Sequence, residues 1–181
     1  MTTPEGASTI FTIGHSTRLI EEFAGLLQSA GVQLVVDVRR IPRSRTNPQY
    51  NLDRLPAELV PWQIDHCYIA ELGGRRSRAN DVPDTVNAFW DNRSFHNYAD
   101  YALSDDYAAG LEQLVRAARL RPTAIMCSEA VWWRCHRRII ADYLLHRGWQ
   151  VCHIMGGNRI ETARMTPGAQ QHGAHLVYPR P

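Results

Sequence analysis

Apolar and polar segments alternate along the chain and predict a succession of strands and helices. Short apolar runs that are rich in β-branched residues are typical of buried strands. Such runs predict strands over 9–14, 34–39, 64–70, 123–129 and 150–155. Between the first two, apolar residues recur at helical spacing up to Gly31, which is a common helix terminator. We expect Ser16 or Thr17 to cap that helix.

Two further helices are predicted over 104–120 and 132–147. Residues 40–62 carry four prolines and are expected to be irregular. Residues 73–97 show no sustained period and are expected to form a long functional or mobile connection.

Strands that alternate with helices predict an α/β fold with a mainly parallel sheet of about five strands, covered on both faces. In the doubly wound order 3-2-1-4-5, ligands would bind beyond the carboxyl ends of the strands. We expect one domain over 9–166, a flexible N-terminal lead over 1–8 and a C-terminal tail over 167–181.

Length, composition and cysteine spacing indicate the class of protein to which the chain belongs. The chain has 181 residues and 44% apolar content, and it lacks an apolar run of the roughly 20 residues that a membrane span needs. No secretory signal is visible at the N-terminus. The four cysteines form no CxxC pair. These features predict a cytoplasmic protein with free thiols and no membrane partner.

The basic residues are unusual because all twenty are arginine. Coding bias explains that choice of residue, but it does not explain the clustering. Ten lie in three short segments: Arg39, Arg40, Arg43 and Arg45; Arg75, Arg76 and Arg78; Arg134, Arg137 and Arg138. Guanidinium groups suit phosphate and carboxylate. They could bind an external anion, or pair internally with Asp37, Glu71 and Glu129.

Polar residues gather where each predicted strand ends, and such strand ends meet at one edge of a parallel sheet. The sequence therefore predicts a shared site. The expected ligand-binding residues are His15, Ser16, Asp37, Arg39, Arg40, Ser44, Arg45, Gly73, Gly74, Arg75, Cys135, Arg137 and Arg138. The expected catalytic residues are Cys127, Glu129 and His136. Trp132 and Trp133 are expected to roof the pocket.

The motifs TIGHSTR, VVDVRRIPRSR, ELGG, YADY, MCSEAVWWRCHRRIIADYL and VCHI resemble those of the domain-of-unknown-function family 488. The resemblance spans about 9–166. It implies a Rossmann-like three-layer α/β/α sandwich and supports the site residues that fall in these motifs. It implies no reaction.

Several chemistries remain as alternatives. Cys127 precedes a helix among arginines, which would lower its pKa and allow a nucleophilic thiolate, but a half-buried structural thiol is the favoured interpretation. A phosphatase signature would need arginine six positions later, where the chain has Trp133. Zinc-type ligands could come from Cys127, Cys135, His136, His15 and His153, but the spacing of the first three matches no structural zinc pattern, so we assign no metal. Without a GxGxxG or P-loop motif, the familiar NAD, FAD and ATP sites are disfavoured and no cofactor is identified.

The leading hypothesis is a strand-end cleft that binds an anionic ligand, which would be phosphate-bearing, a nucleotide or nucleic acid. In an enzyme, Glu129 or His136 would transfer protons. The alternatives are a non-catalytic anion- or nucleic-acid-binding module and a metal-binding protein. Four aromatic residues could stack bases: Tyr50, Trp90, Trp132 and Trp133. The sequence does not fix the oligomeric state.

Overall fold

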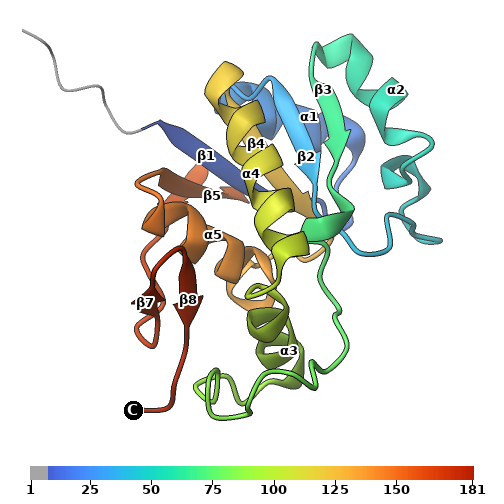
Figure 1. The fold of residues 1–181 in the computed structure, drawn as a ribbon. Helices are drawn as coiled ribbons and strands as arrows, with labels where there is room; N and C mark the ends of the chain where they lie inside the picture. The colour runs from blue at the N-terminus through green and yellow to red at the C-terminus, as the bar shows by residue number, and fades with distance from the viewer. Residues whose placement is uncertain (1–7) are drawn as a thin grey trace, which may run out of the picture.

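A six-stranded sheet forms the centre of this computed structural model, which describes residues 8–181 (Figure 1). Apart from Ser8, the expected N-terminal lead lies outside the described residues. The strands are β1 Thr9–Gly14, β2 Leu34–Asp37, β3 Asp65–Tyr68, β4 Thr123–Cys127, β5 Gln150–Gly156 and β6 Arg159–Thr162. β1 to β5 run parallel, and β6 pairs antiparallel with β5. The predicted α/β fold with a mainly parallel sheet is confirmed.

The strand order is β3-β2-β4-β1-β5-β6, which differs from the order 3-2-1-4-5 considered above. The difference is that β4 lies between β2 and β1. Alternation of strands and helices predicts parallel pairing, but it does not determine into which gap a later strand inserts. β1 and β4 are still neighbours, and Gly14 lies opposite Cys127 at their carboxyl ends.

Helices cover both faces of the sheet and complete the three layers. They are α1 Ile20–Ser29, α2 Leu55–Leu59, α3 Arg93–Tyr101, α4 Asp105–Leu120 and α5 Arg137–His146. Phe23 of α1 and Leu59 of α2 share one core with Val35 of β2. α4 and α5, in front of the sheet in Figure 1, share the other core with residues such as Val36 and Ile125. Neighbouring residues of β2 and of β4 thus enter opposite cores, as a pleated strand requires.

Several local predictions were wrong. α1 begins at Ile20, and its N-cap Leu19 makes no side-chain cap bond, so neither Ser16 nor Thr17 caps it. The segment 40–62 contains α2 and two short 3-10 helices, Pro48–Tyr50 and Val60–Trp62. The segment 73–97 contains the start of α3, which the side chain of Asn92 caps. A third 3-10 helix covers Ala70–Leu72.

The helix predicted over 132–147 is broken near its start. Trp132–Arg134 form a 3-10 helix, and α5 begins only at Arg137. Between them Cys135 is extended, with φ −127° and ψ 149°. This break places the Cys135 side chain at the N-terminus of α5.

The C-terminal segment folds back on the α5 face. β7 Gln170–His172 and β8 His175–Val177 form a hairpin. Leu176 and Tyr178 are fully buried beside α5, and the Tyr178 hydroxyl donates to Asp142 Oδ2 at 2.8 Å. Along residues 8–181, no helix has both the length and the apolar character that crossing a bilayer requires.

Candidate functional site

A cavity of about 700 Å³ opens at the carboxyl edge of the sheet. Its walls come from the segments that follow β1, β2, β3 and β4, together with the start of α3 and the turn before α5. Eleven predicted site residues line it: His15, Ser16, Arg39, Arg40, Ser44, Gly74, Arg75, Cys127, Glu129, Cys135 and His136. The structure therefore brings most of the strand-end residues around one opening.

Five predicted residues lie outside this lining: Asp37, Arg45, Gly73, Arg137 and Arg138. Asp37 and Arg137 are buried beneath the lining residues. Arg138 instead packs over the Trp90 ring, 4.9 Å from its centroid, and donates to Thr166 Oγ1 at 3.2 Å.

Sequence reasoning missed part of the lining. The additional residues are Thr17, Ile41, Arg43, Asn47, Asn92, Ser94, Phe95, Tyr98, Ser128, Ala130 and Arg134. Arg43 and Arg134 belong to the arginine clusters, so the clustering itself was a signal for them. For the α3 residues, the signal was the capping asparagine, Asn92, in a segment otherwise too polar to suggest a packed helix.

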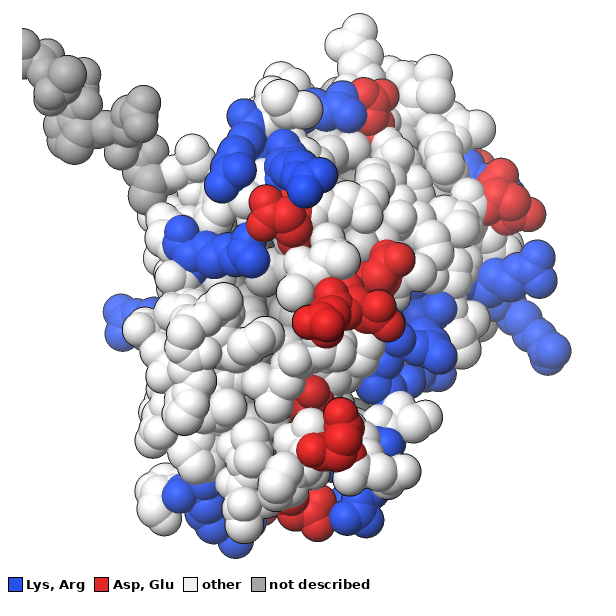
Figure 2. Space-filling view, in the orientation of Figure 1, with Lys and Arg blue, Asp and Glu red and all other residues white. Residues whose placement is uncertain are grey.

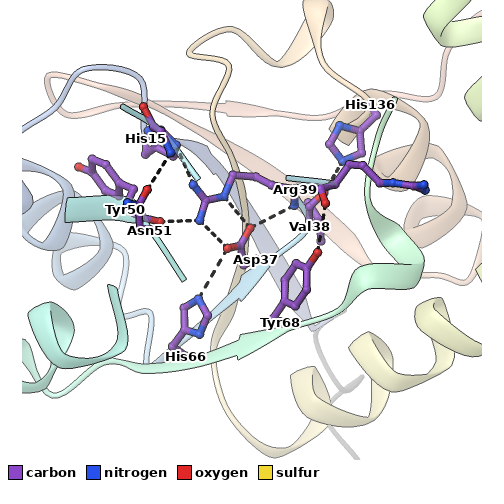
Figure 3. Close-up of polar contacts among 11 residues, drawn as sticks. His15, Asp37, Val38, Arg39, Tyr50, Asn51, His66, Tyr68 and His136 are labelled. Atoms are coloured by element: carbon purple, nitrogen blue, oxygen red, sulfur yellow. Dashed lines mark hydrogen bonds and ion pairs between the residues drawn. The ribbon is translucent and has the colours of Figure 1, made fainter. Parts of the chain in front are cut away.

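Arg39 is the centre of a buried network on the α1 face of the cavity (Figure 3). Its Nε and Nη2 donate to Asp37 Oδ1 at 2.9 Å and Oδ2 at 2.7 Å, which is a bidentate pair. Nη2 also donates to the Tyr50 carbonyl at 2.6 Å, and Nη1 lies 3.3 Å from His15 Nε2. Asp37 is fully buried and Arg39 is 5% exposed, so this pair is part of the frame of the cavity.

His15 has a defined tautomer because of its two neighbours. Its Nδ1 donates to the Ser16 carbonyl at 2.8 Å, which leaves Nε2 to accept from Arg39. The ring stacks on Tyr50 with centroids 4.2 Å apart. Burial lowers the pKa of His15 to about 4, so the ring is neutral at pH 7.

Asp37 is held as a carboxylate. Burial would raise its pKa, but the neighbouring His66 and the hydrogen bonds and charge of Arg39 keep the pKa below its usual value. Arg39 makes the hydrogen bonds, at 2.9 and 2.7 Å, whereas His66 Nε2 is 3.8 Å from Asp37 Oδ2, beyond hydrogen-bond reach. Arg39 is therefore the main partner of the carboxylate.

Two cysteines meet on the α5 face of the cavity. Cys127 ends β4, and its Sγ lies 2.8 Å from Sγ of Cys135, closer than non-bonded sulfur atoms normally approach. All four cysteines of the chain are free thiols in this structure. His136 Nε2 donates to the Val38 carbonyl at 2.7 Å, which leaves Nδ1 to face Cys135 Sγ at 3.5 Å.

The two thiols have opposite acidities. Burial and the adjacent Cys135 raise the pKa of Cys127 well above the ordinary value. Burial would also raise the pKa of Cys135, but the hydrogen bond from Cys127, His136 and Arg137 together hold it well below that value. The backbone N–H of Arg137, at the start of α5, also points at Cys135 Sγ at 3.5 Å. These surroundings favour the ionised form at Cys135 over Cys127, which was the nucleophile candidate considered from the sequence.

Arg137 is a buried cation that lacks a carboxylate partner in the described chain. It is 1% exposed; Nη1 donates to Thr12 Oγ1 at 3.1 Å and Nη2 to the Glu129 carbonyl at 2.6 Å. Its Nε is buried without a hydrogen-bond partner. Burial would lower its pKa, but the charges of Cys127 and Cys135 raise it. Arg137 is therefore buried beside the two cysteines, where other buried arginines have a carboxylate.

The arginines at the mouth of the cavity are unpaired. Arg40, Arg43, Arg75 and Arg134 line the cavity, are exposed, and have no carboxylate of residues 8–181 within 4.0 Å. Glu129 is the single carboxylate among the lining residues. In Figure 2, arginines project from the right-hand edge, where Figure 1 places the loop between β2 and α2. The mouth is strongly positive.

The two tryptophans do not roof this cavity. Trp132 stacks on His153, with centroids 4.5 Å apart, and its Nε1 donates to Glu161 Oε2 at 3.0 Å. Within the described residues, no group of three or more His, Cys, Asp or Glu side chains could hold a metal ion. The alternative metal site at Cys127, Cys135 and His136 gains no support from this geometry.

The backbone around the cavity includes two residues with positive φ and two glycines at close contacts. Ser16 and Arg75 both line it in the left-handed region, with φ 48° and 55°, which non-glycine residues adopt at a cost. A Cβ on Gly14 would lie 1.7 Å from the Glu129 carbonyl oxygen, so only glycine lets β1 approach that loop. A Cβ on Gly74 would lie 2.8 Å from His136 Nδ1.

Comparisons with known proteins identify a family and no individual relative. Searches of curated proteins and of solved structures found no match to this chain. The model of one protein family, described as domain of unknown function DUF488, matches residues 19–144. That range covers more than half of the chain and includes α1, the arginine-rich loop after β2 and the Cys127–His136 turn. The chain therefore belongs to the DUF488 family.

Proposed function

We propose that this protein binds an anionic, phosphate-bearing small molecule in the arginine-lined cavity. The supporting observation is that Arg40, Arg43, Arg75 and Arg134 face one opening without a carboxylate partner from residues 8–181. Guanidinium groups that are not neutralised internally can each donate to phosphate oxygens. The charges of Arg39 and Asp37 already neutralise each other, so this buried pair is part of the rigid frame of the cavity.

The volume of the cavity and the placement of the aromatic residues favour a small-molecule ligand over nucleic acid. A cavity of about 700 Å³ is in the range of small-molecule sites. Tyr50 is stacked on His15, and Trp132 on His153. Trp90 is 6% exposed, and Trp133, at 42%, is the one exposed tryptophan of the four aromatic candidates. A row of free aromatic rings for stacking successive bases is missing from this set.

Glu129 and His136 are the acid–base candidates in the enzymatic form of this proposal. Glu129 lies at the cavity with an exposed side chain. The Nε2–H of His136 is occupied by Val38, so Nδ1 is its nitrogen for proton transfer. Glu129→Gln should leave ligand affinity in place and abolish phosphate release if the protein is an enzyme. In a non-catalytic binding module, wild type should bind and release no phosphate.

Calorimetric titration tests the binding proposal. Inorganic phosphate, a nucleoside monophosphate and a short oligonucleotide are titrated into wild type, Arg40→Ala and Arg75→Ala. Each substitution should weaken phosphate or nucleotide binding about tenfold, or about 1.4 kcal/mol. Arg164→Ala is the matched control, because Arg164 is exposed, does not line the cavity and forms no ion pair. Equal weakening in the control, or no binding by wild type, contradicts the proposal; binding of the oligonucleotide alone would favour nucleic acid.

A further inference from the structure

We propose that Cys135 and Cys127 form a redox-active dithiol at the floor of the cavity, which reduces a small hydroperoxide and closes to a disulfide. This activity is independent of the anion-binding proposal, because it follows from the two sulfur atoms and their surroundings. The arginines at the mouth have no part in it.

Proximity is the first observation. The two Sγ atoms lie 2.8 Å apart, so a bond between them needs only a small further approach. The cysteines come from different elements, the end of β4 and the turn before α5, which the fold brings together. The remaining cysteines lie elsewhere: Cys67 in β3 and Cys152 in β5, both partly exposed.

The environment divides the roles of the two thiols. Cys135 receives the N–H of Arg137, faces His136 Nδ1 and lies beside the buried Arg137 guanidinium, which has an unpartnered Nε. These groups favour a thiolate at Cys135. Cys127 faces the Glu129 carbonyl, at 3.7 Å, and the thiolate itself, so it remains a thiol and a proton donor. This is the arrangement of an attacking and a resolving cysteine.

The limited exposure of the two sulfur atoms determines which class of oxidant can reach them. Both cysteines line the cavity, but they are only 3% and 6% exposed. A molecule of the size of hydrogen peroxide can reach sulfur atoms this deeply buried more readily than a bulky disulfide can. A hydroperoxide is therefore favoured over thiol–disulfide exchange with a large partner.

The chemistry balances in two steps. The proton of the Cys135 thiol first moves to His136 Nδ1, which leaves a thiolate beside an imidazolium. The thiolate attacks one peroxide oxygen; an S–O bond forms, the O–O bond breaks, and the leaving hydroxide takes that proton from His136 Nδ1 to become water. The Cys127 sulfur then attacks the sulfenic sulfur of Cys135; an S–S bond forms, the S–O bond breaks, and the hydroxyl leaves as water with the Cys127 proton. The dithiol loses two electrons and the peroxide gains two.

Mass spectrometry of the full-length reduced protein tests this directly. Hydrogen peroxide is added at pH 6.5, where ordinary thiols are protonated. Trypsin cleaves after Arg134, so the two cysteines fall on different peptides and their crosslink has a unique mass. We expect a Cys127–Cys135 disulfide that forms about tenfold or more faster in the native protein than in urea. Cys67 and Cys152 should stay reduced, and Cys67→Ser/Cys152→Ser should behave as wild type.

Two variants assign the roles. Cys127→Ser should stop at a sulfenic acid on Cys135, trapped as a dimedone adduct, and Cys135→Ser should leave Cys127 unoxidised. Wild type supplies the crosslink result even if a variant fails to fold. The proposal is overturned if native protein gives no crosslink, if Cys67 or Cys152 oxidises at a comparable rate, or if the adduct forms on Cys127. It is also overturned if oxidised glutathione gives the disulfide and peroxide does not.

Discussion

Charged side chains are buried on both faces of this site, and on each face they are stabilised by a different kind of partner. On the α1 face, the Asp37 carboxylate is buried together with a guanidinium that binds it through two hydrogen bonds. On the α5 face, the Arg137 guanidinium is buried with a hydroxyl, a carbonyl and the two cysteines in place of a carboxylate. The first pair is neutralised internally, whereas the second places a fixed cation beside two thiols.

Burial of His15 makes stability depend on pH. Its pKa is about 4 in the folded protein and 6.5 when unfolded. Between these values the unfolded chain binds a proton that the folded protein does not, so stability is present above pH 6.5 and is lost as pH falls. Lowering the pH from 7 to 5 should cost about 2 kcal/mol through His15.

Urea unfolding of His15→Asn at both pH values measures this contribution. The variant should lose about 2 kcal/mol less than wild type over that interval. His172→Asn is the control, because His172 is exposed in β7. An identical pH dependence in wild type and His15→Asn would show that His15 does not carry the effect.

At the scale of elements, the sequence predicted the strands of the parallel sheet and the helices α1, α4 and α5, because their apolar spacing is regular. It did not predict α2 and α3. α2 has only five residues, and α3 packs largely through tyrosine, with few aliphatic residues to mark its buried face. Tyr98, for example, donates to the Leu72 carbonyl at 2.7 Å from a fully buried ring. A helix that packs through tyrosines does not show the regular apolar spacing from which helices are predicted.

For the candidate site, the sequence predicted which residues lie near one another but not where their side chains point. Strand ends of a parallel sheet meet at one edge, so the positions of His15, Arg39 and Cys127 follow from the order of elements. Side-chain direction does not follow from it. Arg137 and Arg138 are adjacent in the sequence, yet one is buried under β1 and the other packs over Trp90. Both residues lie in the first turn of α5, where successive side chains point in different directions, and the sequence did not show where that turn begins.

Close approach of the loop after β3 to α5 requires Gly74. In Gly74→Ala, the new Cβ would lie 2.8 Å from His136 Nδ1 and would have to push the ring away from Cys135. We expect alkylation of Cys135 by iodoacetamide at pH 6.5 to slow several-fold, because the imidazole helps to hold the thiolate.

Gly25→Ala is the control for this experiment. Gly25 lies inside α1, where a Cβ would meet nothing within 4 Å, so the change should stabilise the protein by about 0.5–1 kcal/mol and leave alkylation unchanged. Unchanged Cys135 reactivity in a folded Gly74→Ala variant would mean that His136 does not support the thiolate.

For the whole molecule, the boundary expected at residue 166 remains a proposal that truncation can test. Tyr178 and Leu176 are fully buried, the Tyr178 N–H donates to Asn87 Oδ1 at 2.9 Å, and its hydroxyl donates to Asp142. Removal of 167–181 would expose the apolar surface beneath them and leave Asp142 with one partner fewer. We expect a loss of about 4 kcal/mol or more in urea unfolding.

Removal of 179–181 alone is the matched truncation. Those residues are partly or fully exposed, and the Arg180–Asp91 ion pair lies at the surface, so the loss should stay below about 1 kcal/mol. If the longer truncation is as stable as the full chain, the C-terminal segment is a dispensable tail and the domain ends at 166.

The carboxylate-free burial of Arg137 has a thermodynamic consequence for the equilibrium between dithiol and disulfide. A fixed cation that is stabilised by a thiolate favours the reduced protein, and closing the disulfide removes the negative charge while the guanidinium stays buried. The reduction potential of the pair is thereby shifted in the positive direction, toward that of oxidising dithiols and away from that of structural disulfides. A bond formed here would be easier to reduce than a structural disulfide, and the charge that activates Cys135 would also keep its oxidation reversible.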